Sequence, residues 1–488
     1  MRSAVPGQAT VRTSSRMTSE RSRARMMFTS CSYRGPDRTT RTVGARPVIR
    51  TDRTVGDSGG PPTVPPMGFR DTDAARERAE PWPGHRAERH HLGRAAEARA
   101  QRGTRWIRPA VVLLTGLLVS ACTGEAPAPA ATDDVLGTVV HDTFTALREA
   151  HDIPGIAVGV VHGDRTRLFE FGTTAPGGDH PVTEHTIFEI GSISKLFTTL
   201  LAGTAAAQER LDFDETPGRY LPQLRDYPID GAQIRDFATY TAGGLPQQFP
   251  GEVTTEAEMW RYFQQWRPTY PVGTTRLYGN PGMALLGQAT AAALGRPFED
   301  AMRTEILEPL GLRHTYFDVP APAQDDYAWG TERSGAAVRV SPGPGDTEAY
   351  GLKTTAADLL AFVAANMDNR RAPSALRGPL EATRHGRYRV GSMTQVLGWE
   401  RFEYPVSLET LQAGNSADIV NRPQPVEPAA AASGPALFDK TGSTGGFGAY
   451  VAYVPSRSLA VVVLMNRNIP IPARVAATHR VIEALDSP

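Results

Sequence analysis

Three lysines stand out in a chain whose other basic residues are all arginine: Lys195, Lys353 and Lys440. Arginine keeps its proton in proteins, whereas a lysine amine tuned by burial and neighbours can act as a base. Lys195 follows Ser192 by three residues, and on a helix this spacing brings the amine and the hydroxyl to one face. The pair predicts a serine nucleophile activated by a lysine base, and Lys440 is expected to be a compact cationic donor.

The serine motif, Gly191-Ser192-Ile193-Ser194-Lys195, follows a short β-compatible run at Thr186–Ile190 and is predicted to open a helix, 192–207. The free N–H groups of a helix N-terminus can stabilise a developing oxyanion. On its own, Ser-x-x-Lys is more typical of an ordinary helix start on the surface.

Tyr278-Gly279-Asn280 precedes Pro281. Residues two apart in an extended segment project to the same side, so the phenol and the amide are predicted to face one site. A phenol can transfer a proton when nearby ammonium groups lower its pKa. Taken alone, the tripeptide is more typical of a turn.

Lys440-Thr441-Gly442-Ser443 leads into a C-terminal hairpin. On a strand Lys440 and Gly442 share a face, and the missing side chain at Gly442 leaves room for a substrate backbone along the strand edge. The alternative is a glycine-rich hairpin entry with a solvated lysine.

In this order, the three motifs resemble the signature set of penicillin-recognising serine acyltransferases. More closely, the chain resembles class C, AmpC-type β-lactamases from about Asp134 onward. The segments that carry this resemblance are FEIGSISKLFT at 188–198, ATYTAGGLPQQFP at 238–250, RLYGNPGMALLG at 276–287, DYAWG at 326–330, EAYGLKTT at 348–355 and DKTGSTGGFGAYVAYVPSRSLAVVVLMNRN at 439–468.

The resemblance implies that Ser192 is the nucleophile and that Lys195 and Tyr278 share the proton transfers. Which of the two is the formal base stays open. Lys440 is implied to lie beside the phenol and the substrate carboxylate, and the backbone N–H groups of Ser192 and Ser443 to form the oxyanion hole. The implied substrate-binding residues are Gln248, Asn280, Tyr350, Thr441 and Gly442.

Three positions call for separate expectations. Ile471 stands where relatives commonly have an amide that can contact the substrate carboxylate, so the preference between penicillins and cephalosporins stays open. Gly279, often alanine in relatives, is expected to matter little. Lys353 has no assignable role and is expected to be a surface lysine.

Two other functions share this chemistry. A DD-peptidase or esterase of the same fold would use the same nucleophile on peptidoglycan stems or simple esters, and a β-lactam sensor would be acylated without turning over. The resemblance implies no cofactor, and the 11 histidines show no paired metal-binding spacing, so no metal is expected.

The N-terminal region differs in charge and composition from the rest. Residues 1–108 contain 22 arginines and ten acidic residues, a net charge of about +12 that the remainder balances with about −12. Residues 1–100 are predicted to be disordered or to arise from a translation start assigned too far upstream. The acidic remainder has no basic stripe, so nucleic acid is not an expected partner.

Residues 101–121 are typical of a signal peptide. Three arginines precede an apolar run, 109–119, that is too short to span a bilayer, and the run ends in Val-Ser-Ala-Cys122. This ending resembles a bacterial lipoprotein box, which implies a lipid-anchored protein of the periplasm or cell envelope. The alternative is a soluble exported protein cleaved nearby. Residues 122–132 are predicted to be a tether.

Residues 133–488 are predicted to form one catalytic unit and to act as a monomer. A helix with apolar Val135, Val139, Val140, Phe144 and Leu147 is followed by a hairpin, 155–161 with 168–172, and a second hairpin, 448–454 with 459–466, precedes a closing helix at 473–485. Helices are expected at 256–265, 283–294 and 356–367, and 422–434 as a surface loop. The expected fold is α/β and β-lactamase/DD-peptidase-like: an antiparallel sheet built from both chain ends and flanked by helices, with an inserted, mostly helical domain at roughly 195–350.

Overall fold

The computed structural model describes residues 131–430 and 434–486. Its main element is a nine-stranded antiparallel sheet in the order β13-β9-β10-β11-β14-β15-β16-β1-β2. The strands are β1 Gly155–His162, β2 Arg165–Gly172, β9 Tyr388–Val390, β10 Met393–Gln395, β11 Glu400–Glu403, β13 Glu427–Pro428, β14 Ala436–Ser443, β15 Gly448–Val454 and β16 Leu459–Met465.

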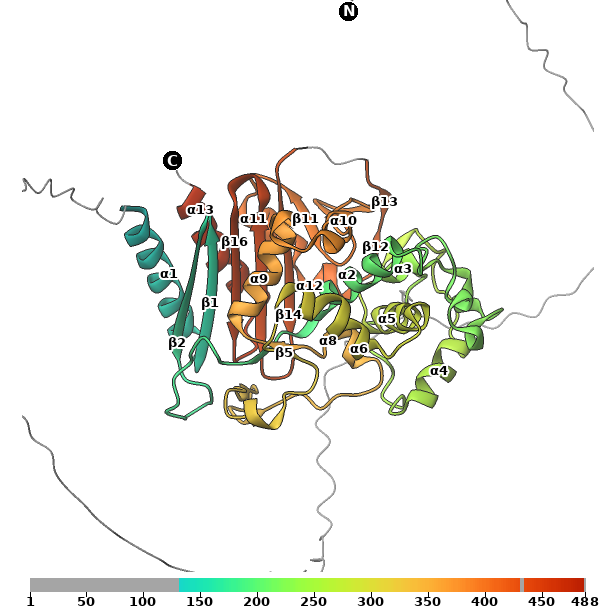
Figure 1. Cartoon of the computed structure of the whole chain (residues 1–488), viewed down its shortest axis with the longest axis horizontal. Helices are drawn as coiled ribbons and strands as arrows, with labels where there is room; N and C mark the ends of the chain where they lie inside the picture. The colour runs from blue at the N-terminus through green and yellow to red at the C-terminus, as the bar shows by residue number, and fades with distance from the viewer. Residues whose placement is uncertain (1–130, 431–433, 487–488) are drawn as a thin grey trace, which may run out of the picture. The chain divides into compact units, whose positions relative to one another are not determined.

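The two ends of the described chain meet inside this sheet. Strand β1 pairs with β16 along its length, from Ile156 opposite Met465 to His162 opposite Leu459. Figure 1 shows the teal N-terminal hairpin lying beside the red C-terminal strands. The expected antiparallel sheet assembled from both chain ends is therefore confirmed.

The sheet is covered on both faces, because successive side chains of β16 belong alternately to two different apolar clusters. Val461, Val463 and Met465 belong to one apolar cluster, whereas the intervening Val462 and Leu464 belong to the other. All five are fully buried. Because side chains alternate across a strand, a continuous apolar run fits a strand buried on both sides.

Helices form the two outer layers. The cluster on one face includes residues of α1 Ala131–Ala150, α11 Leu408–Gly414 and α13 Ile471–Asp486. The other face packs against α9 Ala356–Met367, with α2 Ser194–Ala207 and α10 Ser374–Ala382 in the same cluster. Figure 1 shows α9 lying across the sheet and α1 at its outer edge.

In the segment between α2 and α9 the longer regular elements are helices, and the helices α3 Ile234–Ala238, α4 Glu256–Gln265 and α5 Asn280–Leu294 lie to the right of the sheet in Figure 1. This segment is organised around α5, which contacts α2, α3 and α8 Asp346–Tyr350. Its other α-helices and strands are α6 Phe298–Met302, α7 Glu308–Leu310, β4 Thr275–Arg276, β5 Thr315–Tyr316, β6 Gly330–Thr331, β7 Ala337–Val338 and β8 Lys353–Thr354. Outside this segment lie β3 Phe188–Glu189, α12 Ala417–Asn421 and β12 Gln424–Pro425.

Several local expectations need correction. Val135 is 51% exposed, and the buried face of α1 consists of Leu136, Val140, Phe144 and Leu147, because these residues recur every three or four positions. The expected strand at 186–190 is reduced to β3. The expected loop at 422–434 contains β12 and β13, and β13 extends the sheet edge by pairing with β9.

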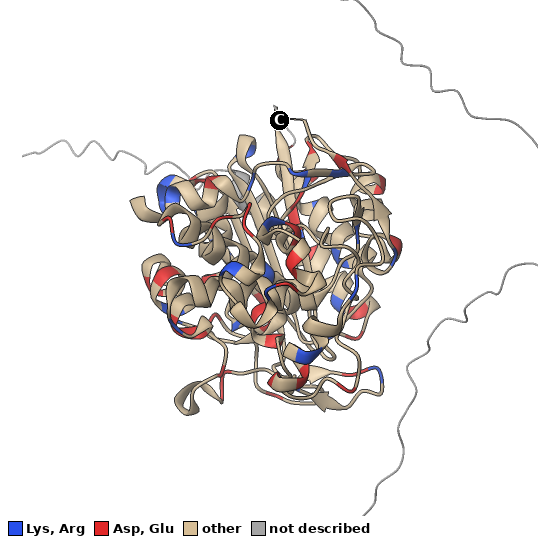
Figure 2. Ribbon diagram, turned by 90° about the vertical axis from the view of Figure 1, so that its right-hand side faces the viewer, with Lys and Arg blue, Asp and Glu red and all other residues tan. Residues whose placement is uncertain are grey.

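Acidic and basic residues are interspersed along the ribbon in Figure 2. In residues 131–430 and 434–486, no helix is both long and apolar enough to cross a membrane. The predicted signal peptide, the lipidation site Cys122 and most of the tether lie outside these residues.

Candidate active site

Ser192 lies in a single 3-10 turn, Gly191–Ile193, immediately before α2. Gly191 has a φ of +51°, and a Cβ at this position would come within 2.5 Å of the backbone nitrogen of Ser443. A Cβ on Gly442 would overlap the carbonyl oxygen of Ile190. The serine-bearing turn and β14 therefore touch backbone to backbone, which only glycines permit.

Lys195 is fully buried and lies one turn after the serine. Its Nζ is 3.0 Å from Ser192 Oγ, 2.6 Å from Asn280 Oδ1 and 2.9 Å from the carbonyl oxygen of Ala349. Burial, together with the charge of Lys440, lowers the pKa of Lys195 although Tyr278 opposes the shift. The amine donates to all three oxygens, and after losing a proton it can accept the proton of the Ser192 hydroxyl instead.

Tyr278 lies between the two lysines. Its hydroxyl hydrogen-bonds with Ser192 and Lys195, and the Nζ atoms of Lys195 and Lys440 are each 5.1 Å from its ring centroid. Burial alone would raise the pKa of this phenol. The positive charges of Lys195 and Lys440 outweigh burial, so the pKa of Tyr278 falls below its usual value.

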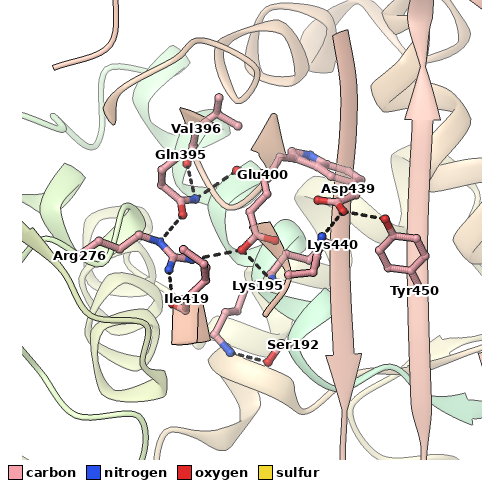
Figure 3. A network of polar contacts seen from close by, with 12 residues as sticks. Ser192, Lys195, Arg276, Gln395, Val396, Glu400, Ile419, Asp439, Lys440 and Tyr450 are labelled. Carbon is pink, nitrogen blue, oxygen red and sulfur yellow. Dashed lines mark hydrogen bonds and ion pairs between the residues drawn. The ribbon is translucent and has the colours of Figure 1, made fainter. Parts of the chain in front are cut away.

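Lys440 is held by a buried ion-pair network, drawn in Figure 3. Its Nζ is 3.6 Å from Glu400 Oε1, and the same oxygen accepts a hydrogen bond of 3.1 Å from Arg276 Nη2. Arg276 also donates to Gln395 Oε1 and to the carbonyl oxygen of Ile419, each at 2.8 Å. Burial would lower the pKa of Lys440, but Glu400 and Tyr278 raise it overall, so Lys440 is a cation.

The predicted substrate-binding residues surround this centre. Asn280, at the start of α5, donates to Gln248 Oε1 at 2.8 Å while its own oxygen accepts from Lys195. Gln248 is exposed, and Thr441 follows Lys440 on β14. Tyr350 ends α8, where its hydroxyl bonds to Asp346, next to the Ala349 carbonyl that holds Lys195.

Two expectations about single positions are wrong. Gly279 matters here, because its backbone is extended and a Cβ would overlap the carbonyl oxygen of Pro246. Lys353 is not a surface lysine: it is 5% exposed and donates to the carbonyl oxygen of Phe317 at 2.5 Å. Strand β8 places it at the centre of a three-stranded sheet, which the sequence motif did not reveal.

The C-terminal departure from the family pattern has a structural counterpart. Ile471 begins α13 and packs against the apolar cluster behind the sheet. Arg474 is buried and donates to the carbonyl oxygen of Gly442 at 2.6 Å and to Ser443 Oγ at 3.1 Å. Burial lowers the pKa of Arg474 to about 10. This arginine braces the end of β14 from the side opposite the serine turn.

The sequence motifs did not reveal Arg276, Glu400 and Asp439. Arg276 lies within a family-like segment, but nothing in its neighbourhood indicates a partner more than a hundred residues away. Glu400 and Asp439 lie opposite each other on β11 and β14, a pairing that only the sheet register defines. Within the part of the chain that the structure describes, no group of three or more His, Cys, Asp or Glu side chains could hold a metal ion.

Comparisons with known proteins agree with this geometry. The model of the Beta-lactamase family matches residues 140–486. The chain is 44% identical over 351 residues to a β-lactamase of Pseudomonas fluorescens, covering 71% of this chain and 98% of that one. It is 38% identical over 379 residues to a β-lactamase of Escherichia coli K12, covering 76% and 98%.

Among solved structures, the chain is similar to a β-lactamase/D-alanine carboxypeptidase from Pseudomonas syringae. The TM-score is 0.70 at 36% identity, with 72% of this chain and 99% of that chain covered. The resemblance seen in the motifs and the expected fold are both confirmed. The chain belongs to the β-lactamase family and is an enzyme that hydrolyses β-lactams.

Proposed function

We propose that the protein is a serine β-lactamase of the class C type, acting through an acyl-enzyme on Ser192. The observation that carries this proposal is the convergence of Ser192, Lys195 and Tyr278, three side chains from two distant segments that share hydrogen bonds. Further support for class C is the Tyr-x-Asn motif and a phenol with a lowered pKa.

Acylation begins when Ser192 Oγ attacks the β-lactam carbonyl carbon and its proton passes to Lys195 or Tyr278. The backbone N–H groups of Ser192 and Ser443 stabilise the resulting oxyanion. The ring C–N bond then breaks, the nitrogen takes the proton, and an ester to Ser192 remains. Lys440 and Thr441 bind the substrate carboxylate, and Gln248, Asn280 and Tyr350 contact its side chain.

Deacylation uses the same groups. When the shared proton lies on Lys195, Tyr278 is a phenolate beside two ammonium groups and is positioned to take a proton from a water that attacks the ester. The ester C–O bond then breaks, and Ser192 Oγ takes that proton back as the acid leaves. Lys195 and Tyr278 are in contact, so their titrations are coupled and the proton belongs to the pair.

Steady-state turnover of a chromogenic cephalosporin by the purified chain is the direct test. We expect multiple turnovers per enzyme, loss of turnover in Ser192→Ala, and a covalent adduct on Ser192 by mass spectrometry of the quenched reaction. One equivalent of product followed by no further release would instead identify a sensor that stays acylated.

One observation favours a second activity: the similar Pseudomonas syringae structure is described as both a β-lactamase and a D-alanine carboxypeptidase. The same nucleophile could cleave a D-alanyl-D-alanine peptide. Comparing kcat/KM for the cephalosporin and for such a peptide ranks the two activities, and a higher value for the peptide would make the enzyme a DD-peptidase first.

We also propose that the protein is exported to the periplasm or cell envelope as a lipid-anchored monomer. The support is the sequence alone: an arginine-flanked apolar run followed by Val-Ser-Ala-Cys122. Expression in a bacterial host with labelled palmitate should give a labelled protein whose label is lost in Cys122→Ser. The molar mass of the solubilised protein, measured by light scattering, tests whether it is a monomer.

A further inference from the structure

A pocket unconnected with the catalytic residues lies toward the opposite end of β14. Its volume is about 920 Å³, within the range of pockets that hold small-molecule ligands. Strand β14 contributes Ala436 and Phe438 to its wall, two to four residues before Lys440. The remaining lining residues are Glu381, Arg384, His385, Gly386, Arg401, Gly434, Pro435, Pro455 and Ser456.

Arg401 is the unusual member of this lining. It lies opposite Phe438 in the β11–β14 register, so the two side chains share one face of the sheet. The residue is only 6% exposed. Among residues 131–430 and 434–486, the guanidinium of Arg401 has no side-chain hydrogen bond or ion pair, whereas those of Arg276 and Arg474 have several. None of the Arg401 nitrogens belongs to the fully buried, unpartnered side-chain atoms of the described residues, so the guanidinium is open to the pocket and available to an anion.

A second guanidinium reinforces the positive charge of the pocket. Arg384, just after α10, is half-buried in the lining and close enough to Tyr453 to lower the pKa of that phenol electrostatically, although burial dominates and raises it overall. Exposed Glu381 is the acidic group in the lining. With His385 counted as neutral, two guanidiniums and one carboxylate leave a single net positive charge, which complements a monoanion.

The remaining wall is apolar. Phe438 stacks on Tyr453 with ring centroids 5.0 Å apart, and Ala436, Pro435 and Pro455 continue this surface. A guanidinium matches the two oxygens of a carboxylate with two parallel hydrogen bonds. We infer that this pocket is a second binding site, for a small organic carboxylate whose charged end pairs with Arg401 and Arg384 and whose apolar body lies against Phe438.

Calorimetric titration of the full chain with phenylacetate tests this site, with 2-phenylethanol as the neutral counterpart. We expect one-site binding of phenylacetate with a Kd of about 1 mM or tighter, and binding of the alcohol at least about tenfold weaker. Arg401→Gln should raise the Kd for phenylacetate by about tenfold or more. The matched control is Arg480→Gln, an exposed arginine of α13 outside the pocket, which should leave the Kd within about twofold.

Arg384→Gln provides a second variant at a half-exposed position, in case Arg401→Gln does not fold, and thermal melting checks the fold of both. It should also weaken phenylacetate binding. Equal binding of the acid and the alcohol, or undiminished binding in the pocket variants, would overturn the proposal, since the ligand would then occupy another site. Cephalosporin turnover measured in parallel is independent of these outcomes because none of the three arginines belongs to the catalytic network.

Discussion

At the scale of residues, the site depends on two buried lysines whose pKa values are shifted in opposite directions. Among the described residues, Lys195 Nζ contacts oxygen acceptors and forms no ion pair with a carboxylate, and burial lowers its pKa. Lys440 is equally buried, but Glu400 lies 3.6 Å from its Nζ and raises its pKa. One amine is thereby prepared to take up a proton and the other to remain a cation. The phenol of Tyr278 lies between them.

Replacing Lys195 by arginine tests the proton-transfer role. The variant keeps the charge but cannot accept a proton, so kcat/KM for a cephalosporin should fall by about 10²-fold or more. Because the buried site is tight, Lys195→Met is the companion variant: it has similar length and no base, and should lose activity too. Rates near those of the wild type in either folded variant would rule out the base role.

Glu400→Gln tests how the ion-pair network sets the pH profile. Removing this negative charge leaves Lys440 and Arg276 less neutralised beside Tyr278. The pKa values of Tyr278 and Lys440 should both fall, so both limbs of the kcat/KM profile should move to lower pH, by on the order of one unit. A shift toward higher pH would contradict this assignment. Thermal melting reports the separate loss of stability from breaking a buried ion pair.

At the scale of elements, the site is held together by close backbone contacts at glycines. The turn that carries Ser192 meets β14 through Gly191 and Gly442, and the segment that carries Tyr278 meets the 245–246 loop through Gly279. Arg474 of α13 braces β14 from the other side. These contacts set the distances between the three catalytic segments more tightly than flexible side chains could.

Gly279→Ala tests this element contact. The added methyl overlaps the carbonyl oxygen of Pro246, so the segment must move, with a stability loss of about 1–3 kcal/mol and a lower kcat/KM because Tyr278 is displaced. Gly251→Ala is the matched control, since a Cβ there meets no atom within 4 Å. Its free energy of unfolding should change by less than about 0.5 kcal/mol. Equal effects of the two substitutions would contradict the steric explanation.

At the scale of the whole molecule, one sheet joins both ends of the described chain and buries polar groups together with its apolar residues. Asp439 is an example: fully buried, it accepts hydrogen bonds of 2.7 Å from Asn415 and Tyr450, and its other oxygen has no partner among the described residues. Burial and the charge of Glu400 raise the pKa of Asp439 to about 7.

This buried acid makes stability depend on pH. Because the folded-state pKa exceeds the unfolded value of about 3.9, the folded state binds the proton more tightly. The stabilisation is full below about pH 4 and is lost as the pH rises through about 7. Asp439→Asn, which mimics the protonated acid, should reduce the loss of stability between pH 5 and 8 by on the order of 2 kcal/mol in chemical denaturation. Parallel curves for the two proteins would contradict this assignment.

The sequence by itself determined the chemistry and much of the architecture. The spacing of Ser192 and Lys195, the Tyr278 motif and the Lys440 motif predicted groups that the structure brings together, and both hairpins and the helices at 256–265 and 356–367 lie where the apolar periodicity placed them. Such features can be predicted from the sequence because they depend on neighbours three or four residues apart, or on alternation along one strand.

Only the tertiary structure decided which distant residues tune the site. Glu400 becomes the partner of Lys440 and Arg276 through the register of β11 on β14, and the close approach of Pro246 leaves no room for a Cβ at Gly279. The burial of Lys353 has the same origin, because its amine reaches the carbonyl oxygen of Phe317, which follows the neighbouring strand β5. Charge pairing, close approach and loss of water depend on distances across the fold, and a linear pattern carries no record of those distances.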